Sequence, residues 1–523
     1  MKKLYYFFSL IITSAFLISC GDDDGVTAPL PTGNTTVYVL GELDVDGISG
    51  TAEFVENDDN SVTVNLSLNG TPDGGTHPAH IHFNTAAEGG GIAVSLGAVD
   101  GTTGESSVTF STLDDGTSIT YNELLNFDGY INVHLSAEEL GTIVAQGDIG
   151  QNELTGTSKV FDLEERAVAG ISGTVTFSER VNGEALAVIS LMNTPDGGSH
   201  PAHIHMNTAA EGGGIAYTFT PVDGTSGMSK SNIASLDDGA AFGYDDILEY
   251  DGYINVHLSA EELGTIVAQG DIGQNELTGT SKVYDLEERA VAGISGTVTF
   301  SERVNGEALA VISLMNTPDG GSHPAHIHMN TAAEGGGIAY TFTPVDGTSG
   351  MSKSNLAALD DGTSFGYDDI LEYDGYINVH LSVDELATIV AQGDIGQNEL
   401  TGESMTYTLN EKDVAGISGD VVFSERVNGE ALAVITLTGT PEGGSHPAHI
   451  HMNSAAEGGA IAYTFTPVDG TTGISMSNIA ALDDESAFGY SDILGYDGYI
   501  NVHLSADELA TIVAQGDIGS NVN

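Results

Sequence analysis

Apolar and polar residues alternate along most of this chain, which predicts β-strands rather than helices. In residues 62–68, valine and leucine occupy every second position, and threonine, asparagine and serine fill the positions between them. That pattern is typical of a strand with one buried face. Glycine-rich turns such as residues 72–75 and 113–116 separate runs of this kind. The pattern repeats every 123 residues, and we expect about eight strands in each period.

Helix signals are few and short. Residues 121–127 predict one short helix, and residues 136–139 have the Ser-x-x-Glu pattern of a capping box that opens a single turn. Many short strands with little helix predict an all-β fold. We therefore expect four tandem antiparallel β-sandwich domains of the superoxide-dismutase or immunoglobulin type, with short helical turns only.

Four Gly-Ile-Ser-Gly segments mark the phase of the repeat, at residues 47–50, 170–173, 293–296 and 416–419. Copies 2 and 3 are identical over 162–232 and 285–355, so they count as one observation, whereas copies 1 and 4 differ at many positions. Gly-Gln-Asn-Glu-Leu-Thr-Gly joints end the first three copies. The predicted domains are residues 35–153, 154–276, 277–399 and 400–523.

The N-terminus has the features of an export signal. Lys2 and Lys3 precede an apolar stretch, and Leu-Ile-Ser-Cys at 17–20 resembles the lipobox of bacterial lipoproteins. We expect residues 1–20 to be a lipoprotein signal peptide, with Cys20 the lipidation site and 21–34 an acidic, proline-containing tether. The acidic residues after Cys20 resemble tags that direct some lipoproteins to the cell surface, so we expect an outer-membrane anchor that faces outward. The alternative is a cleaved signal peptide with an incidental cysteine.

The charge balance excludes some partners. The chain has 12 Lys+Arg against 75 Asp+Glu, a formal net charge of −63. Nucleic acid and anionic lipid need a basic face, so we expect neither. The remaining candidates are the membrane through the lipid anchor, metal ions, and an extracellular protein or polysaccharide. An acidic surface suited to a salty habitat is an equally good explanation of the charge. With one cysteine, disulfides and cysteine-ligated metal sites are excluded.

All sixteen histidines follow the repeat, with four in each copy at the same spacing. They are His77, His80, His82 and His134; His200, His203, His205 and His257; His323, His326, His328 and His380; and His446, His449, His451 and His503. In each copy the second and third histidines lie on one face of a predicted strand, away from the core. The fourth lies on the non-core face of another, and the first is in the preceding loop. If those strands are neighbours, the imidazoles converge.

Three or four imidazoles suit Cu(II) or Zn(II), one ion per repeat, and suit Ca²⁺ poorly. We take all sixteen histidines as candidate ligands. The alternative is that they hydrogen-bond to loop backbone and organise one end of the sandwich. Candidate partners of the ligands are Glu88, Glu211, Glu334 and Glu457, together with Asn132, Asn255, Asn378 and Asn501. The glutamates have a simpler alternative as loop carboxylates that face solvent. Metal affinity should decrease as the pH is lowered, because protons compete for the imidazole nitrogens. We expect the acidic chain to raise the histidine pKa values.

The His-x-His segment, the Gly-Tyr-Ile-Asn-Val-His segment and the Gly-Thr-Ile-Val-Ala-Gln-Gly-Asp-Ile segment together resemble the CHRD domain, which is found in chordin and in many bacterial secreted proteins. The resemblance covers all four copies and implies an extracellular β-module without a defined activity. Ala145 and its counterparts replace an arginine of that family's closing strand. The His-x-His strand also resembles, more distantly, the copper-binding strand of Cu/Zn superoxide dismutases.

The expected function is that of a membrane-anchored surface lipoprotein, in which four CHRD-like domains each bind Cu or Zn. One alternative is a non-catalytic structural or adhesive rod at the cell surface. A copper-dependent redox enzyme is disfavoured because the chain lacks the dismutases' cysteine pair, zinc subloop and active-site arginine, and its negative charge would repel superoxide. Motifs of nucleophilic hydrolases, phosphate loops and dinucleotide sites are also lacking. We therefore expect no enzyme activity.

Overall fold

The computed structural model describes residues 28–522. The expected signal peptide, with Cys20, and residues 21–27 of the expected tether lie outside the described residues. The first strand begins at Pro31, so the last four residues of the segment expected to be a tether belong to β-structure. Within residues 28–522, no helix has both the length and the apolar character that a membrane crossing requires.

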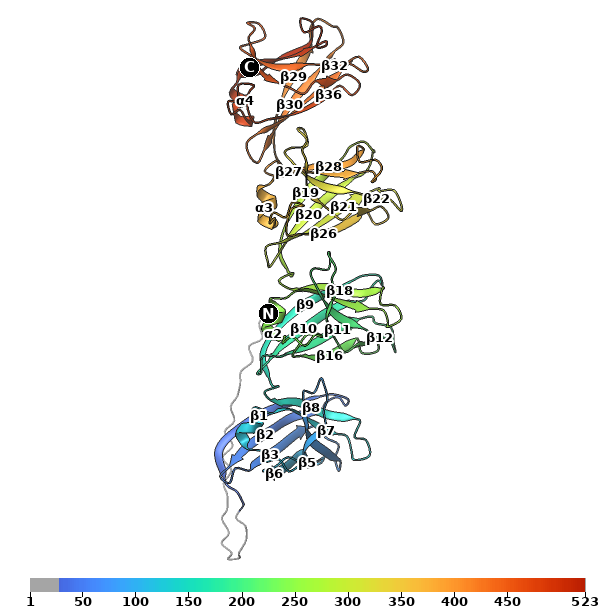
Figure 1. The fold of residues 1–523 in the computed structure, drawn as a ribbon, viewed down its shortest axis with the longest axis vertical. Helices are drawn as coiled ribbons and strands as arrows, with labels where there is room; N and C mark the ends of the chain where they lie inside the picture. The colour runs from blue at the N-terminus through green and yellow to red at the C-terminus, as the bar shows by residue number, and fades with distance from the viewer. Residues whose placement is uncertain (1–27, 523) are drawn as a thin grey trace, which may run out of the picture. The chain divides into compact units, whose positions relative to one another are not determined.

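The all-β class is confirmed. Each of the four repeats is built from antiparallel strands with one short helix beside them (Figure 1). The strands of the first repeat are β1 (Pro31–Glu42), β2 (Ser49–Asn57), β3 (Val62–Asn69), β4 (Thr76–Phe83), β5 (Ile92–Asp100), β6 (Glu105–Phe110), β7 (Asp128–His134) and β8 (Ile143–Gly150). The eight strands expected in this copy are therefore present.

The other three repeats follow the same course with ten strands each. The second repeat has β9 (Leu154–Glu165), β10 (Ser172–Arg180), β11 (Ala185–Met192), β12 (Ser199–His200), β13 (Ala202–Met206), β14 (Ile215–Thr218), β15 (Val222–Asp223), β16 (Met228–Ile233), β17 (Asp251–His257) and β18 (Ile266–Gly273). The third has β19 (Leu277–Glu288), β20 (Ser295–Arg303), β21 (Ala308–Met315), β22 (Ser322–His323), β23 (Ala325–Met329), β24 (Ile338–Thr341), β25 (Val345–Asp346), β26 (Met351–Leu356), β27 (Asp374–His380) and β28 (Ile389–Gly396). The fourth has β29 (Leu400–Glu411), β30 (Ser418–Arg426), β31 (Ala431–Thr438), β32 (Ser445–His446), β33 (Ala448–Met452), β34 (Ile461–Thr464), β35 (Val468–Asp469), β36 (Ile474–Ile479), β37 (Asp497–His503) and β38 (Ile512–Gly519).

The strands of the first repeat close into a barrel in the order β1-β2-β3-β6-β5-β4-β7-β8. Alternation along β3 decides which side chains fill it: its valines and leucines are buried, and the residues between them are half-buried or exposed. Side chains from strands far apart in sequence meet in this core, among them Phe54, Leu66, Ile81 and Ile131. The sequence pattern predicted this alternation.

A proline explains why the later repeats have more strands. In the first repeat, Pro78 on β4 lies opposite Ala98 on β5. The residue equivalent to Ala98 is Pro221 in the second repeat, and Pro344 and Pro467 in the next two. Proline has no N–H to donate to a neighbouring strand. Each long strand of this pair is therefore divided in two, as β12–β13 and β14–β15 show.

The helices are short and do not reach the full predicted length. They are α1 (Tyr121–Leu124), α2 (Tyr244–Leu248), α3 (Tyr367–Glu372) and α4 (Tyr490–Gly495). Thr120 and Glu123 form a capping box at the start of α1. The second predicted turn, at residues 136–139, is not helical: the hydroxyl of Ser136 accepts hydrogen bonds from the amides of Glu138 and Glu139 and holds a bend there.

A buried ion pair forms where one repeat follows another. The Arg180 side chain, at the end of β10, is 0% exposed, and its Nη1 lies 2.7 Å from Oδ2 of Asp148 on β8. The same nitrogen donates to the carbonyl oxygen of Asn152. Both residues belong to one compact unit, which includes residues 28–157 and Ser178–Leu186. Equivalent pairs join Arg303 to Asp271 and Arg426 to Asp394, at 2.8 Å each.

We expect Arg303→Met to destabilise the protein, because it leaves the largely buried Asp271 carboxylate without its cation. Removing one partner of a buried ion pair costs about 3–5 kcal/mol, which for a domain of this size lowers the first thermal unfolding midpoint by roughly 10 °C or more. Circular dichroism melting measures the midpoint. Arg166→Met is the matched control, since Arg166 is exposed. Equal midpoints for the two variants would contradict a stabilising role for the pair.

Candidate metal centre

The two strands with the central histidines are neighbours. In the first repeat, β4 and β7 run antiparallel, with His80 opposite Asn132 and His82 opposite Tyr130. Ala79 and Ile81 alternate with the histidines and are fully buried in the core. Since alternate residues of a strand point to opposite faces, both imidazoles lie on the face away from the core.

Three histidines of each repeat come together. One nitrogen from each of His80, His82 and His134 lies within 4.8 Å of the other two. The ring centroids are 5.2 Å apart for His80 and His134, and 5.8 Å apart for His80 and His82. The same grouping occurs in the other repeats, as His203, His205 and His257; His326, His328 and His380; and His449, His451 and His503. We refer to these four groups as the histidine triads.

Backbone carbonyls decide which nitrogen two of the three imidazoles present. Nδ1 of His134 lies 2.6 Å from the carbonyl oxygen of Leu140, and Nδ1 of His82 lies 3.0 Å from that of Gly90. A carbonyl only accepts, so in each neutral ring Nδ1 has the proton and donates it. The lone pair of Nε2 is then free to bind a metal ion. Nε2 of His82 and Nδ1 of His80 are buried and have no hydrogen-bond partner.

The spacing of these nitrogens suits one small cation. Nδ1 of His203 lies 3.1 Å from Nε2 of His257, and the corresponding atoms of His326 and His380 are 3.0 Å apart. Two nitrogen ligands of a tetrahedral Zn²⁺, at their usual bond lengths, lie roughly 3.3 Å apart. Without an ion, one nitrogen of such a pair has to donate a proton to the other. Three ligands of this kind leave at least one coordination position for water.

Burial lowers the pKa of two imidazoles in each triad, those of His80 and His134 and their counterparts, because desolvation penalises the charged ring. For His80 the neighbouring His134 and His82 lower the pKa further, while Asp114 acts in the opposite direction. In the third repeat the same causes lower the pKa of His326 from 6.5 to about 4. Lowered pKa values also hold for His134, His203, His257, His380, His449 and His503. The upward shift expected from the acidic sequence is therefore wrong: local desolvation outweighs the distant, solvent-screened carboxylates.

The first histidine of each repeat lies outside the triads. His77 is 1% exposed, and its Nδ1 lies 3.3 Å from the backbone carbonyl oxygen of His134. His200 and His446 make the same contact at 3.2 Å with the carbonyls of His257 and His503. His323 is equally buried. These four candidate ligands lie on the strands β4, β12, β22 and β32, and not in the preceding loop where they were expected from the sequence. His77, His200 and His446 each face a backbone carbonyl, as the alternative interpretation of the histidines described, whereas both ring nitrogens of His323 have no hydrogen-bond partner among the described residues.

The expected carboxylate and amide partners make their hydrogen bonds to other groups and not to the imidazoles. Oε2 of Glu88 accepts hydrogen bonds from the backbone amide and hydroxyl of Thr85, and Oδ1 of Asn132 accepts from Gln146. Glu211, Glu334 and Glu457, and Asn255, Asn378 and Asn501, make the corresponding bonds. The partners of the imidazoles are instead the Gly90 and Leu140 carbonyls. Every residue has a carbonyl, so the sequence contains no signal for them.

A tyrosine on the neighbouring strand also orients the site. The Tyr130 ring stacks on His82 with centroids 4.9 Å apart and an interplanar angle of 18°. Its hydroxyl accepts a hydrogen bond from the Gly90 amide, the residue whose carbonyl fixes His82. Stacking and hydrogen bond together restrict rotation of the imidazole. Tyr253, Tyr376 and Tyr499 stack in the same way, and their constant position four residues before the last histidine is the signal that could have identified them.

Comparison with known proteins adds little to this geometry. No family model matches the chain, and no curated protein matches it. Among solved structures, one described as "Biofilm associated protein - BSP domain" is similar over 96% of this chain and 99% of its own, with 10% identity and a TM-score of 0.14. At that score the likeness supports no argument about fold or function.

The lowered pKa values predict an acid-sensitive metal-free protein. Imidazoles of the unfolded chain take up protons near pH 6.5. In the folded chain, burial lowers the pKa of His326 to about 4, so that this ring stays neutral over the pH range between these two values. The stability that these groups contribute is therefore complete above pH 6.5 and is lost as the pH falls below it. We expect the melting temperature to fall between pH 7 and 5.5, and to fall less in His326→Gln. Melts of metal-free protein across this range measure the difference; identical pH profiles would contradict the depressed pKa.

Proposed function

We propose that the protein is a membrane-anchored surface lipoprotein whose four CHRD-like repeats each bind one Cu or Zn ion. The observation that supports this best is the convergence of three imidazole nitrogens within 4.8 Å in every repeat. Copies 1 and 4 differ from the others at many positions and keep the same three histidines. A purely structural use of histidine would not require three ring nitrogens to face each other in every repeat.

The donor set favours particular metals. The triads contain imidazole nitrogen alone, which Cu(II) and Zn(II) accept readily and Ca²⁺ and Mg²⁺ do not. Backbone carbonyls that fix the donor atoms reduce the reorganisation needed on binding, as partners of a ligand usually do. Because burial lowers the pKa of two imidazoles in each triad, protons compete less with the metal for those two nitrogens. Four such sites in one chain multiply its capacity without new chemistry.

The acidic surface supports the same proposal. A formal net charge of −63 attracts cations and raises their concentration near the protein. His80 is half-buried, and its counterparts His203, His326 and His449 each keep 8% exposure. We propose no catalytic step for these sites. The class of partner that we propose for such a surface module is an extracellular protein or polysaccharide.

A structural or adhesive cell-surface protein is the second candidate. It is favoured by His77, His200 and His446, whose ring nitrogens face backbone carbonyls and so tie one strand to another. On this interpretation all the histidines organise the fold and none binds metal. Metal titration separates the two candidates.

Calorimetric titration of the mature chain with Cu(II), Zn(II) and Ca(II) tests the metal proposal. We expect four equivalents of Cu or Zn to bind with sub-micromolar affinity, and no Ca²⁺ binding. His80→Ala removes one triad nitrogen and should reduce the stoichiometry to three. His77→Asn is the matched control, because it changes a histidine of the same repeat that lies outside the triad, and it should keep four. Absence of Cu and Zn binding would favour the structural candidate.

The anchor is tested separately. If Cys20 is lipidated, Cys20→Ser abolishes palmitate incorporation and moves the protein from the membrane fraction to the soluble fraction, because no acyl chains remain to hold it there. Metabolic labelling and fractionation of cells that express the protein measure both effects. Ser14→Ala, in the same segment, should keep the label. A labelled or membrane-bound Cys20→Ser protein would contradict lipid anchoring through this residue.

A further inference from the structure

A short loop connects each histidine triad to a carboxylate on another strand. In the first repeat, Gly90, whose carbonyl accepts from His82, closes a tight loop that follows β4. Within that loop the amide of Gly89 donates to the carbonyl of Thr85, so its backbone is held by its own hydrogen bonds. The amide of Ala86 points out of the loop and donates to Oδ1 of Asp148 at 2.7 Å.

The same carboxylate is held from its other side by the buried arginine. Oδ2 of Asp148 accepts from Arg180, so one aspartate connects the loop of the first repeat to a side chain of the second. Asp148 is largely buried, and its two oxygens have separate partners. Rotation of the carboxylate would break one hydrogen bond or the other. The arginine therefore fixes the oxygen on which the loop depends.

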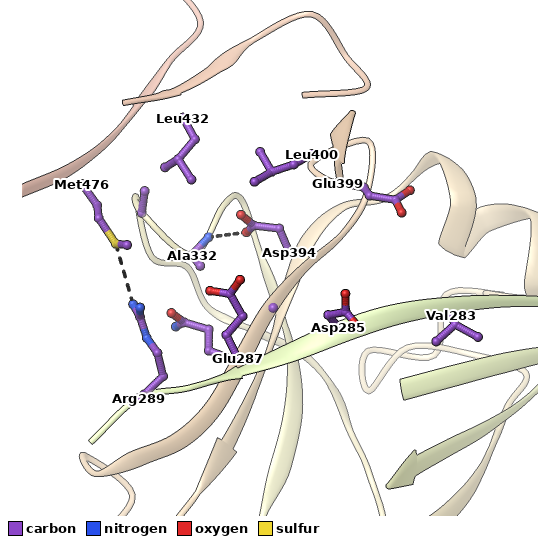
Figure 2. Close-up of a pocket in the computed structure, with 13 residues that line it drawn as sticks. Val283, Asp285, Glu287, Arg289, Ala332, Asp394, Glu399, Leu400, Leu432 and Met476 are labelled. Atoms are coloured by element: carbon purple, nitrogen blue, oxygen red, sulfur yellow. Dashed lines mark hydrogen bonds between the residues drawn. The ribbon is translucent and has the colours of Figure 1, made fainter. Parts of the chain in front are cut away.

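This connection recurs with the same atoms in the next two repeats. Ala209 donates to Asp271, which pairs with Arg303, and Ala332 donates to Asp394, which pairs with Arg426. Figure 2 shows the hydrogen bond between Ala332 and Asp394 at the edge of a pocket. In the fourth repeat Ala455 donates to Asp517, and no arginine within residues 28–522 pairs with that carboxylate.

We propose that Arg180, Arg303 and Arg426 are positioning residues for the histidine triad of the repeat that precedes each of them. The arginine holds the aspartate, the aspartate holds the loop, and the loop carbonyl fixes the proton of His82, His205 or His328 on Nδ1. Nε2 of that histidine then points at the metal. This inference rests on the proposed function, and it makes three of the four sites dependent on the repeat that follows.

The third site allows the sharpest experiment. A background of His80→Ala, His203→Ala and His449→Ala leaves the triad of His326, His328 and His380 as the one intact site. In that background we compare Arg426→Met with Arg289→Met. Arg289 is an exposed arginine that lines the same pocket, and its contact is the sulfur of Met476 (Figure 2). Both variants remove one positive charge, and only one of them interrupts the connection to His328.

The measurements are Cu(II) affinity by competition titration and the electron paramagnetic resonance spectrum of the bound Cu(II). Loss of a direct partner of a metal ligand weakens binding about 10–100-fold. Arg426 acts one step further away, so we expect about 3- to 10-fold weaker binding with an altered copper hyperfine splitting. Arg289→Met should change neither. The spectrum reports ligand geometry, which a general loss of stability at the junction would not alter in the protein that remains folded.

A second variant tests the other end of the connection. Ala332→Pro removes the amide that donates to Asp394 and leaves the Arg426–Asp394 pair in place. Ala332 is the second residue of a turn in which the Glu334 amide donates to the Thr331 carbonyl, and proline is favoured at that position of a turn. It should weaken Cu(II) binding at the third site and change the spectrum as Arg426→Met does. If Arg426→Met does not fold, this variant decides alone.

Two negative results have different meanings. If the background protein binds Cu(II) at its third site and both Arg426→Met and Ala332→Pro leave affinity and spectrum unchanged, the positioning role is overturned and the metal function stands. If the background protein, and the parent chain with four intact triads, bind no Cu(II) or Zn(II), the proposed function fails and this inference fails with it.

Discussion

The antiparallel pairing of β4 with β7, and of its counterparts in the other repeats, is the constraint on which the site depends. It sets His80 beside Asn132 and His82 beside Tyr130. A shift of one residue would turn both histidines into the core and bring Ala79 and Ile81 out to solvent. The buried alternation of β4 therefore fixes the position of the imidazoles as strictly as it fixes the core. Fold and site are specified by the same residues.

Much of the fold could be predicted because alternation and glycine-rich turns are local signals. The convergence of the three triad histidines also followed, since two segments with outward-facing histidines needed only to be neighbours. The Gly90 and Leu140 carbonyls could not be predicted, because backbone acceptors have no residue identity. Arg180 was missed although its recurrence every 123 residues in a chain with only 12 basic residues was a usable signal. Its partner Asp148 is hidden among 75 acidic residues.

The pKa of the triad histidines shows why net charge is a poor guide to a particular site. Charges on a protein surface are screened within about 10 Å at ordinary ionic strength. Burial removes water directly from a triad imidazole such as His326, and the groups beside it that lower its pKa are other imidazoles. Burial and the neighbouring imidazoles therefore decide whether the pKa of a triad histidine is raised or lowered. The acidic surface acts at longer range, on the concentration of cations that reach the site rather than on the ligands themselves.

The buried arginines have a consequence for how such a chain can lengthen. A buried ion pair adds little net stability over an apolar contact and contributes mainly specificity. Each inner repeat has an arginine near its start, such as Arg303, and an aspartate near its end, such as Asp394. A duplicated copy would therefore bring both halves of the junction with it. The second and third copies are identical over 71 consecutive residues, 162–232 and 285–355, which include the arginine and three of the four histidines. Duplication in whole units of 123 residues thus preserves the junction and the histidine triad together, whereas a copy that ended within a repeat could separate one from the other.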